Sequence, residues 1–205
     1  FDTGMIKGKE CLIQIKDVQK SGDDIIHTGE IEGKWNPSDH FTASVNLERR
    51  NKIRKNHTAT HLLHKALQIV LGKHVKQSGS LVDDEKLRFD FAHFEKMSAE
   101  EIKKAELIVN EEIQKAKALS IGVHDIEDAK AMGATALFGE KYGDKVRVVQ
   151  VPEFSMEFCG GTHVSNTGEI GVFKIVSESS VASGIRRIEG MTGILAFETL
   201  ASSYE

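Results

Sequence analysis

The sequence predicts an α+β fold with a mixed or antiparallel sheet and helices, preceded by part of a small β-barrel-like unit. Two observations support this prediction. Several short runs place an apolar residue at every second position, which is typical of strands. Two longer runs instead repeat apolar residues every three or four positions, which indicates amphipathic helices. Because the strand-like runs dominate the start of the chain, we expect two domains, residues 1–50 and 51–205.

The first fifty residues have the pattern of a small β unit. Apolar residues alternate with polar ones in three runs, at 10–15, 24–31 and 41–47. Turn-forming residues separate these runs, and Gly33 is one of them. We therefore expect three strands before the first helix.

The rest of the chain mixes helices and strands. Residues 54–71 contain no Pro or Gly and precede Gly72, as expected of a helix that stops at a glycine. Ser98 and Glu101 form a capping box at the start of a second amphipathic helix, expected to reach Leu119. A short helix is expected at 125–132, and strands are expected at 87–91, 121–124, 145–151 and 170–177.

Composition narrows the class of protein. The 27 Lys and Arg against 31 Asp and Glu give a net charge of −4, which excludes a strongly basic nucleic-acid coat. No stretch approaches the roughly 18 apolar residues of a membrane span, and residues 1–10 lack a signal-peptide core. Two cysteines are too few for a disulfide framework, so we expect a cytoplasmic protein without a membrane partner. The start of the chain, without Met, suggests a piece of something longer.

Two pairs of metal-ligand residues stand out. His57 and His61 lie four residues apart on the first expected helix, so their side chains point only about 40° apart. Cys159 and His163 are also four apart, in a glycine-rich loop that can fold tightly. Taken alone, each pair can be an ordinary polar face or turn. Together they supply four ligands suited to Zn²⁺, although the angle of His64 does not exclude it as a ligand.

A basic cluster at residues 49–55 precedes His57 and overlaps the start of the expected helix. Cations oppose the dipole at a helix N-terminus, so local stability does not explain them. We predict that this cluster meets the phosphates of a polyanion, although a solvated run of charge is the alternative. The residues expected to contact these phosphates are Arg50, Lys52, Arg54 and Lys55.

Several of these segments, in order along the chain, closely resemble the editing domain of alanyl-tRNA synthetases. The similar segments are residues 54–63, 77–82, 87–91, 137–143, 159–163 and 184–189. The resemblance implies hydrolysis of tRNA-Ala mischarged with serine or glycine, with Zn²⁺ held by His57, His61, Cys159 and His163. It also implies that the rest of a synthetase chain is a partner, and the start at 2–4 looks like the tail of its β-barrel segment.

The expected reaction is attack of water on the ester between the amino acid and the tRNA. Four protein ligands fill a tetrahedral zinc, so the metal either loosens one ligand for catalysis or has a structural role. Backbone N–H groups of Gly160 and Gly161 are candidates for stabilising the oxyanion. The side chains expected to recognise the serine hydroxyl, which alanine lacks, are Thr58, Thr60 and Gln77.

Other functions remain compatible with these residues. Free-standing alanyl-tRNA editing proteins are similar in the same motifs, and the threonyl-tRNA synthetase editing domain is a weaker alternative. A non-catalytic zinc module that binds RNA and a zinc hydrolase of small esters or amides are rivals of different classes. The HExxH motif of zinc proteases and the zinc deaminase signature are both missing, which counts against those two enzyme classes.

Overall fold

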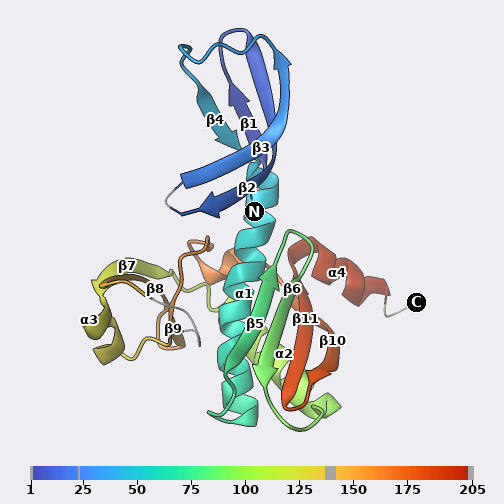
Figure 1. The fold of residues 1–205 in the computed structure, drawn as a ribbon. Coiled ribbons are helices and arrows are strands. Elements are labelled where there is room, and N and C mark those ends of the chain that lie inside the picture. The colour runs from blue at the N-terminus through green and yellow to red at the C-terminus, as the bar shows by residue number, and fades with distance from the viewer. Residues whose placement is uncertain (1, 23, 137–141, 203–205) are drawn as a thin grey trace. The chain divides into compact units, whose positions relative to one another are not determined.

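The computed structural model describes residues 2–22, 24–136 and 142–202 (Figure 1). It contains two compact units, residues 1–51 and 52–205, and each is described by itself. Helix α1 (Leu47–Leu71) begins in the first unit and ends in the second. Within the motif at 137–143, residues 137–141 lie outside the described residues.

The first unit is an antiparallel sheet with the strand order β3-β2-β1-β4. The expected strands at 10–15, 24–31 and 41–47 correspond to β2, β3 and β4, whereas no strand is expected at β1. Because β3 and β4 are the edges, the sheet is open across the residues that the structure describes. The four strands are β1 (Gly4–Lys7), β2 (Cys11–Ser21), β3 (Asp24–Gly33) and β4 (Thr42–Val45).

The second unit contains a larger antiparallel sheet with the order β10-β11-β6-β5. Its core joins this sheet to α1 and to α2 (Ala99–Gln114), through fully buried residues such as Leu63 of α1, Phe89 of β6 and Val109 of α2. Fully burying one such side chain stabilises the fold by roughly 1.5–3 kcal/mol. The strands are β5 (Gln77–Val82), β6 (Leu87–Ala92), β10 (Phe173–Ala182) and β11 (Ile185–Thr192).

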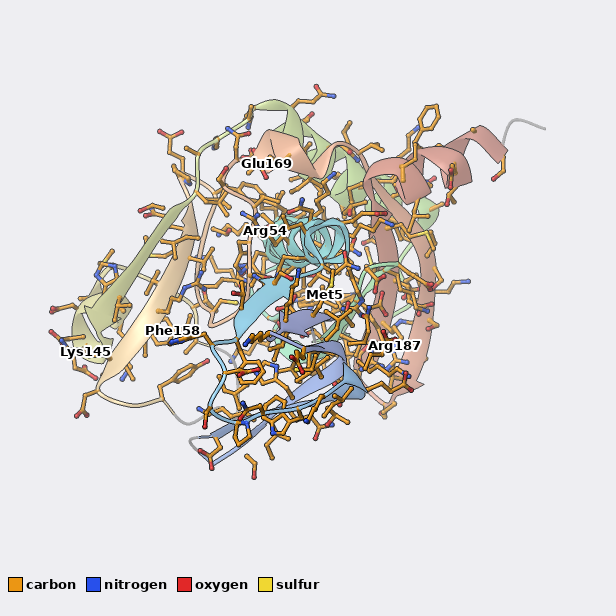
Figure 2. The ribbon with its side chains drawn as sticks, turned by 90° about the horizontal axis from the view of Figure 1, so that it is seen from above. Met5, Arg54, Lys145, Phe158, Glu169 and Arg187 are labelled. Carbon is orange, nitrogen blue, oxygen red and sulfur yellow. The ribbon has the colours of Figure 1, made fainter. Side chains whose placement is uncertain are left out.

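A smaller antiparallel sheet carries the strands that lead into the cysteine loop. It has the order β7-β8-β9 and packs α3 (Ile126–Ala131) over a small cluster that includes Val148 and Phe158. In Figures 1 and 2, α1 lies between this sheet and the larger one. The strands are β7 (Ser120–Asp125), β8 (Lys145–Val151) and β9 (Ser155–Phe158). The expected α+β class is therefore confirmed.

Both long helices differ from expectation at one end. Helix α1 begins at Leu47 instead of near residue 54, because the Asn46 side chain accepts the backbone N–H of Arg49 at 3.0 Å and caps the first turn. Helix α2 ends at Gln114 instead of Leu119. There Ala116 has a positive φ of 49°, and the Thr167 hydroxyl donates to the Glu112 carbonyl at 2.9 Å, so tertiary contacts end the helix.

Several short elements have no counterpart in the sequence prediction. Strands β5 and β9 and helix α4 (Gly193–Ser202) are examples. Strand β5 contains Gly79 and two serines, and β9 has four residues, so neither carries a clear alternation of apolar residues. Pairing with β6 and β8, respectively, forms these strands. Residues 167–170, just before β10, form a 3₁₀ turn.

No helix within the described ranges has both the length and the apolar content to cross a membrane.

Candidate metal centre

Two of the predicted ligands lie on one face of α1. His57 and His61 are one helical turn apart, with their ring centroids 5.3 Å from each other. The helix faces the hydrophobic core through residues such as Leu62 and Ala66, which are fully buried. His61 is buried and His57 half-buried, so both rings lie between α1 and the chain that packs on it.

The other two predicted ligands follow β9 in the loop 159–163. Arg147 of β8 fixes this loop, because its Nη1 donates to the carbonyls of Cys159 at 2.7 Å and Gly161 at 2.8 Å. The backbone N–H of Cys159 donates in return to the carbonyl of Arg147 at 2.9 Å. Sheet pairing and one guanidinium therefore position the cysteine beside the helix.

The four predicted ligands converge. One ligand atom from each of His57, His61, Cys159 and His163 lies within 4.8 Å of the others. The Cys159 sulfur is 3.4 Å from Nε2 of His57 and 3.3 Å from Nε2 of His163. Zinc bonds of about 2.3 Å to sulfur and 2.1 Å to nitrogen, at tetrahedral angles, place such atoms about 3.6 Å apart. Donor chemistry and spacing both fit a Zn²⁺ ion.

The histidines of this group are neutral near pH 7. Burial lowers the pKa of His57 to about 4, assisted by the neighbouring His61 and opposed by a hydrogen bond to the Thr162 backbone. Burial also lowers the pKa of His61 and of His163. A metal ligand must be unprotonated, so these rings are ready to bind an ion without first releasing protons.

A buried carboxylate lies behind His61. Glu157 of β9 has its Oε2 3.8 Å from Nδ1 of His61 and its Oε1 3.2 Å from Nδ1 of His64. Burial opposes ionisation of this carboxyl, but His61 and His64 outweigh it, and the pKa of Glu157 is lowered. Gln68 contacts the other ring nitrogen of His64 at 3.2 Å. Because both nitrogens of His64 have partners, it supports the cluster instead of joining the four ligands.

The Thr58 hydroxyl lies beneath the cluster and is fully buried. It donates to the Arg54 carbonyl at 2.9 Å, lies 3.1 Å from Nδ1 of His163, and accepts the backbone N–H of Val164 at 3.2 Å. A hydroxyl offers one donor and two acceptor positions, and these three contacts occupy all of them. Thr58 therefore touches a ligand histidine, with no hydrogen-bonding capacity left for a substrate.

Comparisons with known proteins match the parts of the chain that carry these residues. The family model described as the threonyl and alanyl tRNA synthetase second additional domain matches residues 146–189, which include all of β8 but its first residue, together with β9 and the cysteine loop. Over all 205 residues, 100% of the chain, the sequence is 50% identical to alanine–tRNA ligase of Thermoanaerobacter sp. (strain X514). It is 52% identical to the ligase of Bacillus subtilis (strain 168), over 98% of the chain. The chain belongs to the alanyl-tRNA synthetase editing-domain family.

The chain spans 23% of the length of those two ligases. A third alanine–tRNA ligase, of Legionella pneumophila (strain Paris), is 52% identical over 94% of the chain, which covers 22% of the ligase. The aligned region thus extends far beyond the matched family model and covers α1, the helix that carries His57 and His61.

The remaining candidate residues of this editing-domain chain lie in different surroundings. Thr60 is buried and donates to the Asn56 carbonyl at 2.9 Å. Gln77, on the edge strand β5, donates to the Ser80 hydroxyl at 3.0 Å. The N–H of Gly161 points at the Cys159 sulfur at 3.4 Å, whereas Gly160 is exposed. Their roles toward a substrate stay predictions.

The basic run is divided between the two units, and part of it has protein partners. Arg50 forms a two-point ion pair with Asp2, with Nε 2.6 Å from Oδ1. Arg54 donates through Nε to the carbonyl of His163, which connects it to the metal centre. Lys52 and Lys55 are half-buried on the same helix. Contact with tRNA stays a prediction for all four.

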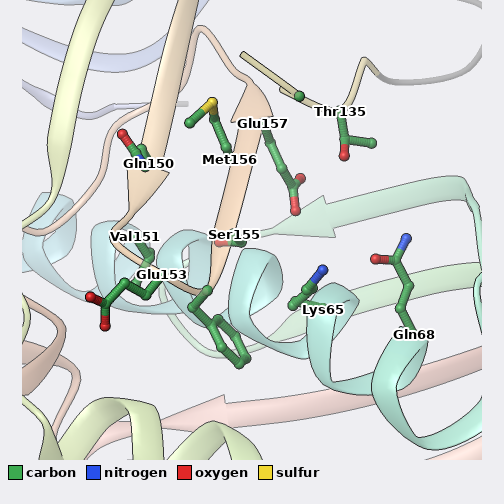
Figure 3. Close-up of a pocket in the computed structure, with 11 residues that line it drawn as sticks. Lys65, Gln68, Thr135, Gln150, Val151, Glu153, Ser155, Met156 and Glu157 are labelled. Carbon is green, nitrogen blue, oxygen red and sulfur yellow. The ribbon is translucent and has the colours of Figure 1, made fainter. Parts of the chain in front are cut away.

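A cavity of about 230 Å³ lies between α1 and the β8–β9 hairpin (Figure 3). Lys65 and Gln68 line it from α1, and Ser155 and Glu157 line it from β9. None of the four ligand residues lines this cavity. Glu157 thus lines this cavity and also approaches a ligand histidine, with its Oε2 3.8 Å from Nδ1 of His61.

Two residues of the site, Arg147 and Glu157, are missing from the sequence prediction. Glu157 is the one charged residue of β9, and Arg147 lies between two valines of β8, a strand that also contains Lys145 and Gln150. Such a charge next to a ligand motif is a usable signal, because strands that face a core seldom carry one without a partner. Their partners come from α1 and the loop, which no periodicity reveals.

Proposed function

We propose that this chain hydrolyses tRNA-Ala mischarged with serine or glycine, as the editing part of an alanine–tRNA ligase in the cytoplasm, with Zn²⁺ held by the four-residue cluster. The convergence of four ligand atoms within 4.8 Å carries this proposal. Similarity to alanine–tRNA ligases over the whole chain supports the choice of tRNA-Ala as partner. The mischarged amino acids follow from the resemblance to the editing domain.

The proposed reaction is attack of water on the acyl carbon of the aminoacyl ester. When bound, zinc supplies either a Lewis acid for the ester carbonyl or a structural cross-link between α1 and the loop. His57 is half-buried and Gly160 is exposed. The side of the cluster formed by the loop 159–163 is therefore open to a substrate. The N–H of Gly160 is the remaining backbone donor for an oxyanion, since that of Gly161 faces sulfur.

Selectivity requires a group that bonds the serine hydroxyl. An apolar pocket discriminates poorly between serine and alanine. A buried polar group that bonds the serine hydroxyl would be left unpaired when alanine binds, which costs roughly 1–3 kcal/mol of binding free energy. We assign this role to Thr60 or Gln77. Thr60 donates to Asn56, so its oxygen can still accept a hydrogen bond, and the Gln77 amide carries both donors and acceptors.

The test is deacylation of Ser-tRNA-Ala measured beside Ala-tRNA-Ala, with and without a chelator. We expect faster hydrolysis of the seryl ester, and loss of activity and of bound zinc in His57→Ala. His27→Ala is the matched control, because His27 is exposed in β3 and outside the cluster. Equal rates on both tRNAs would reject editing.

Further substrates separate the rival functions. Hydrolysis of a free seryl ester at the same rate as Ser-tRNA-Ala would indicate a small-ester hydrolase. Binding of tRNA with bound zinc but no turnover would indicate a non-catalytic RNA-binding module. A preference for Ser-tRNA-Thr would indicate the specificity of a threonyl-tRNA synthetase editing domain.

A further inference from the structure

We infer that Thr58 and Glu157 are positioning residues that fix the ring tautomers of His163 and His61, so that both histidines present Nε2 to the metal. This inference rests on the metal site of the proposed function. It concerns two buried residues that contact ligand histidines and are not themselves among the four ligands.

The first part of the argument is the Thr58 hydroxyl. Its one hydrogen goes to the Arg54 carbonyl, 2.9 Å away. One of its acceptor positions receives the N–H of Val164. The remaining contact, 3.1 Å to Nδ1 of His163, must therefore have the histidine as donor. A proton on Nδ1 leaves the lone pair on Nε2, the atom 3.3 Å from the Cys159 sulfur.

The second part is a directed chain of hydrogen bonds that ends at Glu157. The Gln68 amide nitrogen donates to the Val75 carbonyl at 3.2 Å and also lies 3.2 Å from Nε2 of His64. An amide nitrogen only donates, so Nε2 of His64 accepts and its Nδ1 carries the proton. That proton is donated to Oε1 of Glu157 at 3.2 Å.

The chain fixes the carboxylate in place beside His61. With Oε1 held by His64, the other oxygen of Glu157 lies 3.8 Å from Nδ1 of His61. This buried nitrogen has no hydrogen-bond partner among the described residues. A carboxylate beside it favours a proton on Nδ1 and the lone pair on Nε2, as in the carboxylate–histidine–zinc arrangement of metalloenzymes.

The tautomers can be measured directly. In metal-free protein with ¹⁵N-labelled histidine, two-bond ¹⁵N–¹H spectra should show the Nδ1–H tautomer for His61 and His163. In protein loaded with ¹¹³Cd, the metal should couple to Nε2 of both rings, and this readout remains if the metal-free form unfolds. An Nε2–H tautomer, or cadmium coupling to Nδ1, at either ring overturns the assignment for that ring.

The effect on zinc binding provides the second test. Thr58→Val and Glu157→Gln should each weaken zinc binding about 10–100-fold in competition with a chromophoric chelator. Thr58→Val should also give a mixture of His163 tautomers, whereas Thr58→Ser should retain the wild-type state.

Two matched variants serve as controls. Thr199→Val removes a helical hydroxyl that bonds the Leu195 carbonyl, four residues earlier, and Glu112→Gln changes another buried carboxylate. Both should bind zinc as the wild type does. Wild-type affinity in Thr58→Val and Glu157→Gln overturns this inference alone, whereas a wild-type chain that binds no zinc overturns the proposed metal site.

Discussion

The two glycines between Cys159 and Thr162 have opposite surroundings. A Cβ atom built on Gly161 would lie 2.0 Å from Cε1 of His57 and 2.5 Å from its Nδ1. A Cβ on Gly160 would meet nothing within 4 Å. The His57 ring packs directly on the backbone of Gly161, so only one of the two positions excludes a side chain.

Gly161→Ala should therefore displace the His57 ring and reduce the zinc content of the purified protein. Atomic absorption would measure the metal, and thermal melting would show whether the loss of metal also lowers stability. Gly160→Ala is the matched control and should keep full zinc. Equal zinc content in the two variants would contradict the close packing of His57 on this loop.

At the scale of elements, α1 combines a metal-binding face with a cationic first half. Arg54 bonds the carbonyl of His163, so its charge contributes to holding the cysteine loop. Arg50 is bound to Asp2 within the first unit. Lys52 and Lys55 lie half-buried on the same helix, outside the four predicted metal ligands, and we predict that their charges contact the phosphates of tRNA.

Replacing both Lys52 and Lys55 with Ala should weaken tRNA binding and reduce the slope of log affinity against log salt by up to about 2, because each phosphate contact releases counterions. Filter binding across a salt series measures this slope. Lys103→Ala with Lys104→Ala removes the same charge from exposed positions on α2 and should change it less. An unchanged slope after replacement of Lys52 and Lys55 would indicate that these lysines are solvated surface charges that do not contact phosphates.

For the whole molecule, stability depends on the core that joins α1, α2 and the larger sheet. Leu63 is fully buried in it, whereas Ile69, on the same helix, is 51% exposed. Leu63→Ala should lower the free energy of unfolding by about 2–5 kcal/mol, since it removes apolar contacts and leaves a cavity. Ile69→Ala should cost clearly less in the same urea titration. Similar costs would contradict the described packing of α1.

The sequence alone determined the fold class and the identity of the strongest elements. Alternation at 87–91 and the Ser98–Glu101 capping box gave β6 and the start of α2, and in the structure the box is complete. Both signals are local, because side-chain spacing and helix caps depend on neighbouring residues. The two ligand pairs were visible for the same reason: each repeats at four residues on one short segment.

The tertiary structure alone decided how the two pairs meet and what supports them. Glu157, Arg147 and Thr58 act through partners about 90, 12 and 105 residues away, so no local pattern reveals their roles. The same holds for the end of α2, which Thr167 ends from a distant turn. Spacing along the chain identifies groups able to bind a metal, but only packing fixes which nitrogen each ring presents and which neighbour holds it there.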